Sequence, residues 1–386
     1  MGETTDTGLA GRIDAAVDKA LAERRIVGAS VLVARDGRLA YSRHAGLADR
    51  EAGRPIADDT IFRLASLTKP MVTAAALSLV EAGAIGLEDP VTRWLPDFRP
   101  QYEGAAPAIT VRQLLTHTAG LSYGFMQPAD GPYLQLEVSD GMDQPGLSFD
   151  DELSRVVQAG LFYPPGAAWL YSVAMDVLGA ALEKAVGKPL PVIVAERVAA
   201  PLGMADTGFV VTDPSRLAVP YADGTPPQNP PVRMGEACTV PFFDLSGIRF
   251  APGRAFDLTS FPSGGAGMVG TAREFLSFLE AIRTGGGGVV GADTARQMMS
   301  NQTGELAIVT NGPGWGFGFG GAVHLDPARS GSVHSKGVWL WGDVYGHSWF
   351  VDPARSLSVL VMTNTAIEGI TGAFSVDVAA TVQADR

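Results

Sequence analysis

Cysteine is nearly absent from this sequence. Cys238 is the single cysteine among 386 residues, which excludes an intrachain disulfide and favours a reducing compartment. Histidine is also scarce: there are five, and none stands in a metal-holding spacing such as H-E-x-x-H. We therefore predict no metal site and no cofactor.

Two further absences limit the partners of the chain. Its 29 basic residues are outnumbered by 41 acidic ones and form no cluster, which argues against nucleic acid as a partner. No apolar run reaches the roughly 18 residues that a membrane-spanning helix needs. The opening MGETTDTGLAGR is polar and acidic and lacks the apolar region of a signal peptide. We predict no membrane association and a cytoplasmic location.

Apolar side chains and glycine are abundant instead. Hydrophobic residues make up 46% of the chain and there are 47 glycines, which predicts a large core with many loops on a firm scaffold. Helices are predicted at residues 8–24 and 373–382. Short apolar strands are predicted at residues 28–34, 39–42, 316–323, 346–351 and 357–363.

Strands near both ends of the chain predict an α+β fold whose sheet is built from both ends and flanked by helices. Residues 1–75 and 271–386 would form this domain, and residues 76–270 a mostly helical inserted domain with long pocket-forming loops. The loops at 123–150 and 207–261 are rich in proline and glycine, and we expect them to set the substrate. The cleft between the domains is the expected place for a site.

A serine and a lysine stand three residues apart where a helix is predicted to begin. The apolar run that follows Ser66 and Lys69 stops at Gly83, so Ser66 lies near the start of a buried helix and Lys69 shares its face. A hydroxyl beside an amine can form a nucleophile without histidine, and helix-start N–H groups favour an oxyanion. The alternative is that Ser66 only caps the helix and Lys69 is solvated, because S-x-x-K is a short motif.

Tyr171 is the candidate for a second proton-transfer group. A free phenol has a pKa of about 10 and a free lysine one of about 10.4, so neither is a base at neutral pH unless a neighbour shifts its pKa. A buried pair of Lys69 and Tyr171 could do this, because the ammonium favours the phenolate. The alternative is a core tyrosine whose hydroxyl binds a backbone carbonyl.

Six motifs follow one another along the chain. They are Phe62-Arg63-Leu64-Ala65-Ser66-Leu67-Thr68-Lys69-Pro70, Leu114-Leu115-Thr116-His117-Thr118-Ala119-Gly120-Leu121, Tyr171-Ser172-Val173-Ala174-Met175-Asp176, Pro201-Leu202-Gly203-Met204, Ser263-Gly264-Gly265-Ala266-Gly267-Met268 and Trp341-Gly342-Asp343-Val344-Tyr345-Gly346-His347-Ser348-Trp349-Phe350. In this order they resemble the serine β-lactamase-like and penicillin-binding superfamily, of the class C and D,D-peptidase type, and more closely its family VIII carboxylesterases. The resemblance extends from about residue 12 to about residue 380 and implies the β-lactamase/transpeptidase-like fold with an antiparallel sheet.

The resemblance also implies roles for individual residues. Ser66 would be the nucleophile that carries the acyl group, and Lys69 and Tyr171 would share the general-base and general-acid work. The oxyanion hole would be formed by the backbone N–H groups of Ser66 and Val344. Apart from the resemblance, the aromatic residues Tyr123, Phe125, Trp339, Trp341 and Trp349 could line an acyl or alcohol pocket, and the alternative for at least half of them is core packing. The residues expected to bind the substrate are Tyr123, Phe125, Trp341, Gly342 and Val173.

The chain departs from the β-lactamase pattern at two motifs. Val173 replaces the asparagine of Tyr-x-Asn, and Trp341-Gly342-Asp343 stands where Lys-Thr-Gly is usual. These replacements fit an uncharged ester better, because buried polar substrate groups left unpaired are costly. The esterase branch usually reads Trp-Gly-Gly, so Asp343 is a further departure. Its side chain could bind Tyr345 or add charge near the cleft, and we expect it to face solvent.

Three functions remain open. The first is a serine carboxylesterase acting on short-chain acyl esters of small molecules, with acyl transfer to alcohols as an additional reaction. The second is a β-lactamase or D,D-peptidase, and the third a non-catalytic binding relative. Ser122 lies in a G-x-S-x-G motif, but it lacks the preceding strand and following helix of a nucleophile elbow. We expect His117 to end a helix and bond to backbone, and His347 to have a structural role.

Overall fold

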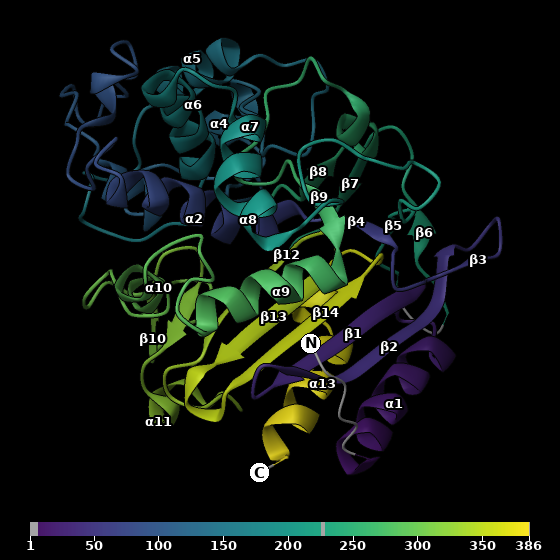
Figure 1. Ribbon diagram of the computed structural model, residues 1–386. Coiled ribbons are helices and arrows are strands. Elements are labelled where there is room, and N and C mark those ends of the chain that lie inside the picture. The colour runs from purple at the N-terminus through teal and green to yellow at the C-terminus, as the bar shows by residue number, and fades with distance from the viewer. Residues whose placement is uncertain (1–6, 225–227, 386) are drawn as a thin grey trace.

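An eight-stranded antiparallel sheet forms one half of the molecule in the computed structural model, which describes residues 7–224 and 228–385 (Figure 1). In spatial order its strands are β10 (Trp315–Phe317), β11 (Ala322–His324), β12 (Trp339–Asp343), β13 (His347–Asp352), β14 (Leu357–Thr363), β1 (Gly28–Arg35), β2 (Arg38–Asp49) and β3 (Arg54–Pro55). Strand β1 pairs with β14, so the two ends of the chain meet in the middle of the sheet. The predicted α+β fold is confirmed.

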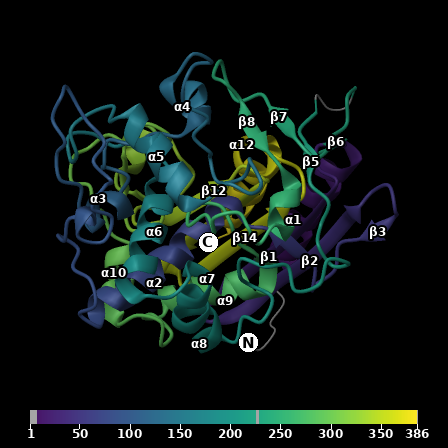
Figure 2. The same cartoon turned by 90° about the horizontal axis from the view of Figure 1, so that it is seen from above.

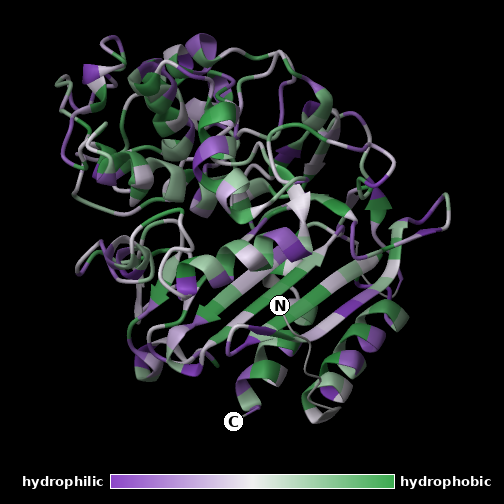
Figure 3. Cartoon of the chain, viewed as in Figure 1, coloured by the Kyte–Doolittle hydropathy of each residue, from purple (hydrophilic) through white to green (hydrophobic). Residues whose placement is uncertain are grey.

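The central strands are apolar along their whole length. Seven of the eight residues of β1 are buried, and so are all residues of β14. Such continuous burial is expected where both faces of a sheet are covered. Figure 3 shows hydrophobic residues along these strands and more hydrophilic ones along β2, nearer the edge of the sheet.

Helices cover both faces of the sheet. Helix α9 (Ala272–Arg283) packs on one face against β1 and β14, while α1 (Thr7–Ala22) and α13 (Ala373–Ala384) pack against each other on the other face (Figure 1). The buried residues of α1 lie three or four positions apart, as in an amphipathic helix. This second core contains Leu9, Ile13, Val17, Phe374, Val378 and Val382.

A mostly helical region lies above the sheet in Figure 1, and Figure 2 looks down onto it. Its helices are α2 (Thr68–Glu81), α3 (Val111–Leu115), α4 (Pro132–Gln135), α5 (Phe149–Ala159), α6 (Ala174–Val186), α7 (Leu190–Val194) and α8 (Ala200–Leu202). Every residue of α2 from Thr68 to Leu79 is buried, so this helix is a central element and not an amphipathic surface helix. It contacts both α6 and α7.

Short strand pairs and short helices complete the described structure. The pairs are β4 (Ile61–Arg63) with β9 (Val269–Thr271), β5 (Tyr221–Ala222) with β6 (Val232–Arg233), and β7 (Cys238–Val240) with β8 (Ile248–Phe250). The remaining α-helices are α10 (Ala292–Met298), α11 (Pro327–Ser330) and α12 (Glu368–Thr371). Among the residues described, no helix is both long and apolar enough to cross a membrane.

Several predicted elements differ from the observed ones. The predicted strand at 316–323 is two strands, β10 and β11, because Gly320 takes a φ of +85° in the turn between them. Strand β2 extends far beyond the predicted residues 39–42, and β12 is a strand that the sequence pattern does not predict. The predicted boundary after residue 75 falls within the continuous helix α2, and the division into 1–75 with 271–386 and 76–270 stays a prediction.

Candidate active site

Ser66 lies in a single turn that joins β4 to α2. Residues Ala65–Leu67 form a 3-10 helix in which the Leu67 N–H donates to the Leu64 carbonyl at 2.8 Å. Ala65 takes a φ of +36°, which is costly for a residue with a side chain and is often found at functional sites. The turn places Ser66 at the start of α2, as predicted, with 7% of its surface exposed.

Two side chains donate hydrogen bonds to the Ser66 hydroxyl. Lys69 Nζ lies 3.1 Å and Tyr171 Oη 2.6 Å from Ser66 Oγ. Lys69 Nζ also donates to the carbonyl of Gly265 at 2.8 Å, and Trp341 Nε1 donates to Tyr171 Oη at 3.1 Å. The structure therefore brings together the three side chains that the motifs predict, although they come from α2 and from the segment before α6.

Burial changes the protonation of Lys69. Removal from water lowers the pKa of this amine to about 7, against the opposing effect of the carboxylates of Asp176, Asp343 and Asp140. The Nζ atom lies 4.6 Å from the ring centre of Tyr171. A substantial share of Lys69 is therefore neutral near pH 7, and a neutral amine can accept a proton.

Burial has the opposite consequence for Tyr171. It raises the pKa of the phenol well above its ordinary value, and the hydrogen bonds with Ser66 and Trp341 only partly oppose this. The direction of this shift is opposite to the expectation that the ammonium of Lys69 would favour a phenolate, because removal from water disfavours the charged form of the phenol. A neutral phenol can donate a proton to a leaving group.

The two residues expected to form the oxyanion hole line the same cavity. Strand β12 ends at Asp343, and Val344 begins the turn that leads to β13. Ser66 and Val344 both line one cavity. Over residues 7–224 and 228–385 neither amide donates a hydrogen bond to another group, so both are free to bind a substrate oxygen.

The side chain of Asp343 is buried, which corrects the expectation that it faces solvent. Its Oδ1 accepts a hydrogen bond from the Tyr345 N–H at 2.6 Å, so the carboxyl group closes the turn that contains Val344. Oδ2 lies 3.8 Å from His347 Nε2. Burial raises the pKa of Asp343 well above its ordinary value. The residue therefore shapes the backbone beside the reacting groups.

A cavity of about 700 Å³ opens from Ser66 and Tyr171. Phe125, Trp341 and Gly342, three of the residues expected to bind the substrate, line it. Several other lining residues lie far from any motif, and no local pattern in the sequence indicates them. These are Met126, Phe242, Phe243, Leu245, Val309, Val333 and Val376. Phe242, Phe243 and Leu245 belong to the proline-rich loop at 207–261, which was expected to set the substrate.

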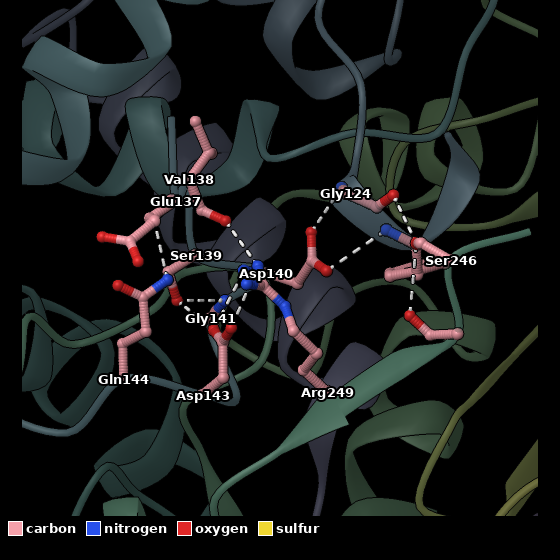
Figure 4. A network of polar contacts seen from close by, with 12 residues as sticks. Gly124, Glu137, Val138, Ser139, Asp140, Gly141, Asp143, Gln144, Ser246 and Arg249 are labelled. Atoms are coloured by element: carbon pink, nitrogen blue, oxygen red, sulfur yellow. Dashed lines mark hydrogen bonds and ion pairs between the residues drawn. The ribbon is translucent and has the colours of Figure 1, made fainter. Parts of the chain in front are cut away.

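A polar network around Asp140 holds the loop that contains Gly124 (Figure 4). The carboxylate of Asp140 accepts hydrogen bonds from the N–H groups of Gly124 at 2.6 Å and Phe125 at 3.3 Å. The Ser246 hydroxyl donates to the Gly124 carbonyl at 3.0 Å, which connects this loop to the one that carries Phe242. Both substrate-facing loops are therefore tied to one another by buried polar groups.

Two residues predicted to bind substrate do not line this cavity. The Tyr123 ring packs against Tyr171 with centroids 5.0 Å apart, and Lys69 Nζ lies 5.1 Å from its centre. Val173 is fully buried at the start of α6, where its N–H donates to the Ser122 carbonyl. The structure places both behind the reacting groups.

The remaining candidates have structural surroundings. His117 Nδ1 lies 3.1 Å from Ser172 Oγ, so the expected bond to backbone is wrong for its side chain. Its ring packs 5.0 Å from that of Tyr171. His347 Nε2 bonds to the Arg63 carbonyl at 2.9 Å. Ser122 is buried outside the cavity and donates to the carbonyl of Tyr123. Among the described residues, no three His, Cys, Asp or Glu side chains could hold a metal ion.

Comparisons with known proteins agree on one family. The family model described as Beta-lactamase matches residues 13–373. The chain is 51% identical over 373 residues to Esterase EstB of Burkholderia gladioli, and the match covers 95% of this chain and 93% of that protein.

Solved structures show the same fold. EstCE1, described as a hydrolase with promiscuous acyltransferase activity, superposes with a TM-score of 0.91 at 44% identity, covering 97% of this chain and 98% of that one. Simvastatin synthase (LovD) of Aspergillus terreus superposes with a TM-score of 0.73 at 23% identity, covering 97% of each chain, and shows the fold alone.

Proposed function

This chain belongs to the beta-lactamase family, and from that membership we propose that it is a serine carboxylesterase, which hydrolyses small-molecule esters through an acyl-enzyme on Ser66. One observation carries the proposal: Ser66 Oγ lies within hydrogen-bonding distance of both Lys69 Nζ and Tyr171 Oη. Its similarity to Esterase EstB and to EstCE1, a hydrolase, supports it.

The first half of the reaction acylates the serine. Ser66 Oγ attacks the ester carbonyl carbon while its proton passes to the neutral amine of Lys69, whose pKa of about 7 suits a general base. The tetrahedral intermediate collapses as the carbon–alkoxide bond breaks. Tyr171 gives its proton to the leaving alkoxide, and the Lys69 ammonium then restores the proton of Tyr171.

Two backbone amides stabilise the intermediate. Ser66 and Val344 both line the cavity, and among the described residues neither backbone N–H has another acceptor, so a carbonyl oxygen that becomes negative there would accept from both. A single donor of this kind contributes about 10² to 10³ in rate. Because this donor belongs to the backbone, any substitution at Val344 other than proline leaves its N–H in place.

The second half releases the acyl group. Water attacks the acyl carbon, its proton passes to the pair of Lys69 and Tyr171, and Ser66 Oγ leaves with a proton from that pair. An alcohol in place of water gives a new ester by the same proton transfers. The promiscuous acyltransferase activity of EstCE1 supports this additional reaction for the present chain.

The lining of the cavity favours an uncharged, apolar substrate. Trp341 stands where a lysine-containing motif would grip a carboxylate, and Phe125 and Phe242 add apolar surface beside it. Apolar walls cannot pair the charged carboxylate of a β-lactam, which makes its burial costly. We propose a short acyl group and an apolar alcohol portion as the substrate. A β-lactamase or D,D-peptidase is the second candidate, supported by the family match.

The proposal extends to partners and location. The substrate is the only partner we propose, and we propose a cytoplasmic location, which the single cysteine supports. A non-catalytic binding relative is the least supported alternative, because nucleophile, base and acid all stand within bonding distance.

Hydrolysis of p-nitrophenyl acetate, butyrate and octanoate, beside a chromogenic cephalosporin, tests the function. We expect wild type to hydrolyse the short esters quickly and the cephalosporin slowly, and Ser66→Ala to lose roughly 10³-fold or more in ester turnover. Ser122→Ala is the matched control, because it removes a buried serine hydroxyl outside the cavity. Ester turnover that survives in Ser66→Ala would overturn the nucleophile, and dominant cephalosporin turnover would favour the second candidate.

A further inference from the structure

Asp176 is a buried carboxylate that the reaction itself does not use. Resting on the proposed function, we propose that Asp176 is a positioning residue: it fixes the Gly265 peptide so that the Gly265 carbonyl holds the Lys69 amine beside Ser66.

A continuous chain of hydrogen bonds carries this inference. Asp176 Oδ1 accepts from the Gly265 N–H at 3.1 Å, and the carbonyl of the same residue accepts from Lys69 Nζ at 2.8 Å. Lys69 Nζ lies 3.1 Å from Ser66 Oγ. Rotation of the Gly265 backbone would therefore move the group that holds the amine.

Other residues of the loop around Gly265 also bond to the Asp176 carboxylate. The Ser263 hydroxyl donates to Asp176 Oδ1 at 2.5 Å and accepts from the Ala266 N–H at 2.9 Å. A Cβ atom at position 265 would lie only 2.8 Å from Tyr123 Oη and 3.1 Å from Asp176 Oδ2. Glycine is required because the backbone passes close to both side chains.

Helix α6 connects Asp176 to Tyr171, the proton donor of the proposed reaction. Asp176 lies in the first turn of α6, and Tyr171 lies just before the helix begins. One element therefore reaches Ser66 from two sides: directly through the Tyr171 phenol, and through Gly265 and Lys69.

The charge of Asp176 also acts on Lys69. After burial, it is the largest influence on the pKa of the amine, which it raises. The other charged groups that face Lys69 are Asp343 from β12 and Asp140 from the loop at 123–150. Those that face Asp176 include Arg254 from the loop after β8 and Glu152 from α5. Tyr123 and Tyr171 lie against the amine as uncharged rings.

The two effects of Asp176 can be separated by two substitutions. Asparagine in Asp176→Asn can still accept from the Gly265 N–H but carries no charge, so the pKa of Lys69 falls further. Because Lys69 acts in its neutral form, activity then persists to lower pH. Alanine in Asp176→Ala removes the acceptor too, so the Gly265 peptide loses its support.

The experiment is the pH dependence of kcat/KM for p-nitrophenyl butyrate. We expect Asp176→Asn to move the acid limb down by roughly one pH unit with a plateau within a few-fold of wild type. We expect Asp176→Ala to lower the plateau by about tenfold as well. Glu368→Gln is the matched control: Glu368 is a buried carboxylate that accepts a backbone N–H, from Phe374, without reaching Gly265 or facing Asp176. Its acid limb should stay where it is in wild type.

An acid limb that Asp176→Asn leaves unchanged would overturn the inference, as would an unchanged plateau in Asp176→Ala. If either variant does not fold, Ser263→Ala replaces it: loss of this donor makes the carboxylate easier to protonate, so the limb should move the same way by a smaller amount. A different result would overturn the proposed function itself, namely ester turnover that survives in Ser66→Ala.

Discussion

The two ends of the cavity differ in how their side chains are held. At the inner end Ser66 and Lys69 are buried, and their polar atoms bond to one another, to Tyr171 and to Gly265. At the mouth the side chains are apolar and exposed, with 77% of Phe243 and 59% of Val309 open to solvent.

This difference separates chemistry from recognition. A hydrogen-bonded, buried group has one geometry, and moving it costs both bonds and packing. An exposed apolar side chain has no such partner and can change without disturbing the reacting groups. Substitutions at the inner end should therefore change kcat, while those at the mouth should change KM for particular substrates.

The largest effect should come from Lys69→Met, which keeps the length of the side chain but removes the base. We expect kcat/KM for p-nitrophenyl acetate to fall roughly 10³-fold, in the range of lost general-base catalysis. Steady-state kinetics on protein with unchanged circular dichroism would measure this. Activity within tenfold of wild type would mean that another group takes the Ser66 proton.

The same substitution should stabilise the fold in a pH-dependent way. Burial lowers the pKa of Lys69 from 10.5 to about 7, so below pH 7 the folded protein holds a costly buried cation. Wild type should gain stability relative to Lys69→Met as pH rises from 7 to 10.5, by up to about 1.4 kcal/mol for each pH unit. Urea unfolding at pH 6.5 and pH 9.5 measures this change, and a difference that is independent of pH would contradict it.

Tyr171 and Tyr123 give the sharpest contrast within the inner end. Tyr171→Phe should lower kcat roughly 10²-fold or more, because it removes the proton donor. Tyr123→Phe should leave kcat nearly unchanged and raise the free energy of unfolding by about 1 kcal/mol, because within the described structure its buried hydroxyl has no partner. An equal loss of kcat in the two variants would contradict the assignment of Tyr171 to the reaction and of Tyr123 to packing.

A smaller effect is expected for Trp341→Phe, at the border of the two regions. It removes the hydrogen bond from Nε1 to Tyr171 Oη but keeps an aromatic ring on the cavity wall. We expect a loss of about tenfold in kcat, the size of one hydrogen bond to a reacting group. A change confined to KM would instead mean that Trp341 acts in substrate binding, like the residues at the mouth of the cavity.

The smallest effect is expected for Phe243→Ser at the mouth. We expect KM for p-nitrophenyl octanoate to rise about threefold, because apolar contact area is lost. With p-nitrophenyl acetate, which lacks the long acyl chain, KM should stay as in wild type. A matched fall in kcat for both esters would contradict the independence of the two ends.

Much of the inner end could be predicted from the sequence because its residues lie in short local motifs. The serine and lysine share one helix start, and the tyrosine precedes another, so spacing along the chain already indicates their placement. The sheet was predictable for a similar reason, since β1 and β14 are continuous apolar runs.

The residues at the mouth of the cavity and the buried polar residues behind it could not be predicted from the sequence, because their positions depend on contacts between distant segments. Nothing local distinguishes Val309 or Val376 as cavity residues, since their position follows from the packing of loops and α13. Asp343 was expected in solvent because a charged residue is rarely buried. Tyr123 was expected at the substrate because aromatic residues commonly line pockets, yet it lies behind the lysine.

The meeting of β1 and β14 in the middle of the sheet also governs how this protein folds. The Val27 N–H donates to Thr365 Oγ1, 338 positions along the chain. A ribosome therefore releases the apolar strand β1 long before its partner exists, and the turn that carries Val344 emerges after α2 and α6. Such high contact order slows folding and leaves strand edges open to aggregation. We expect yields in a heterologous host to depend on chaperones and low temperature more than on the stability of the finished fold.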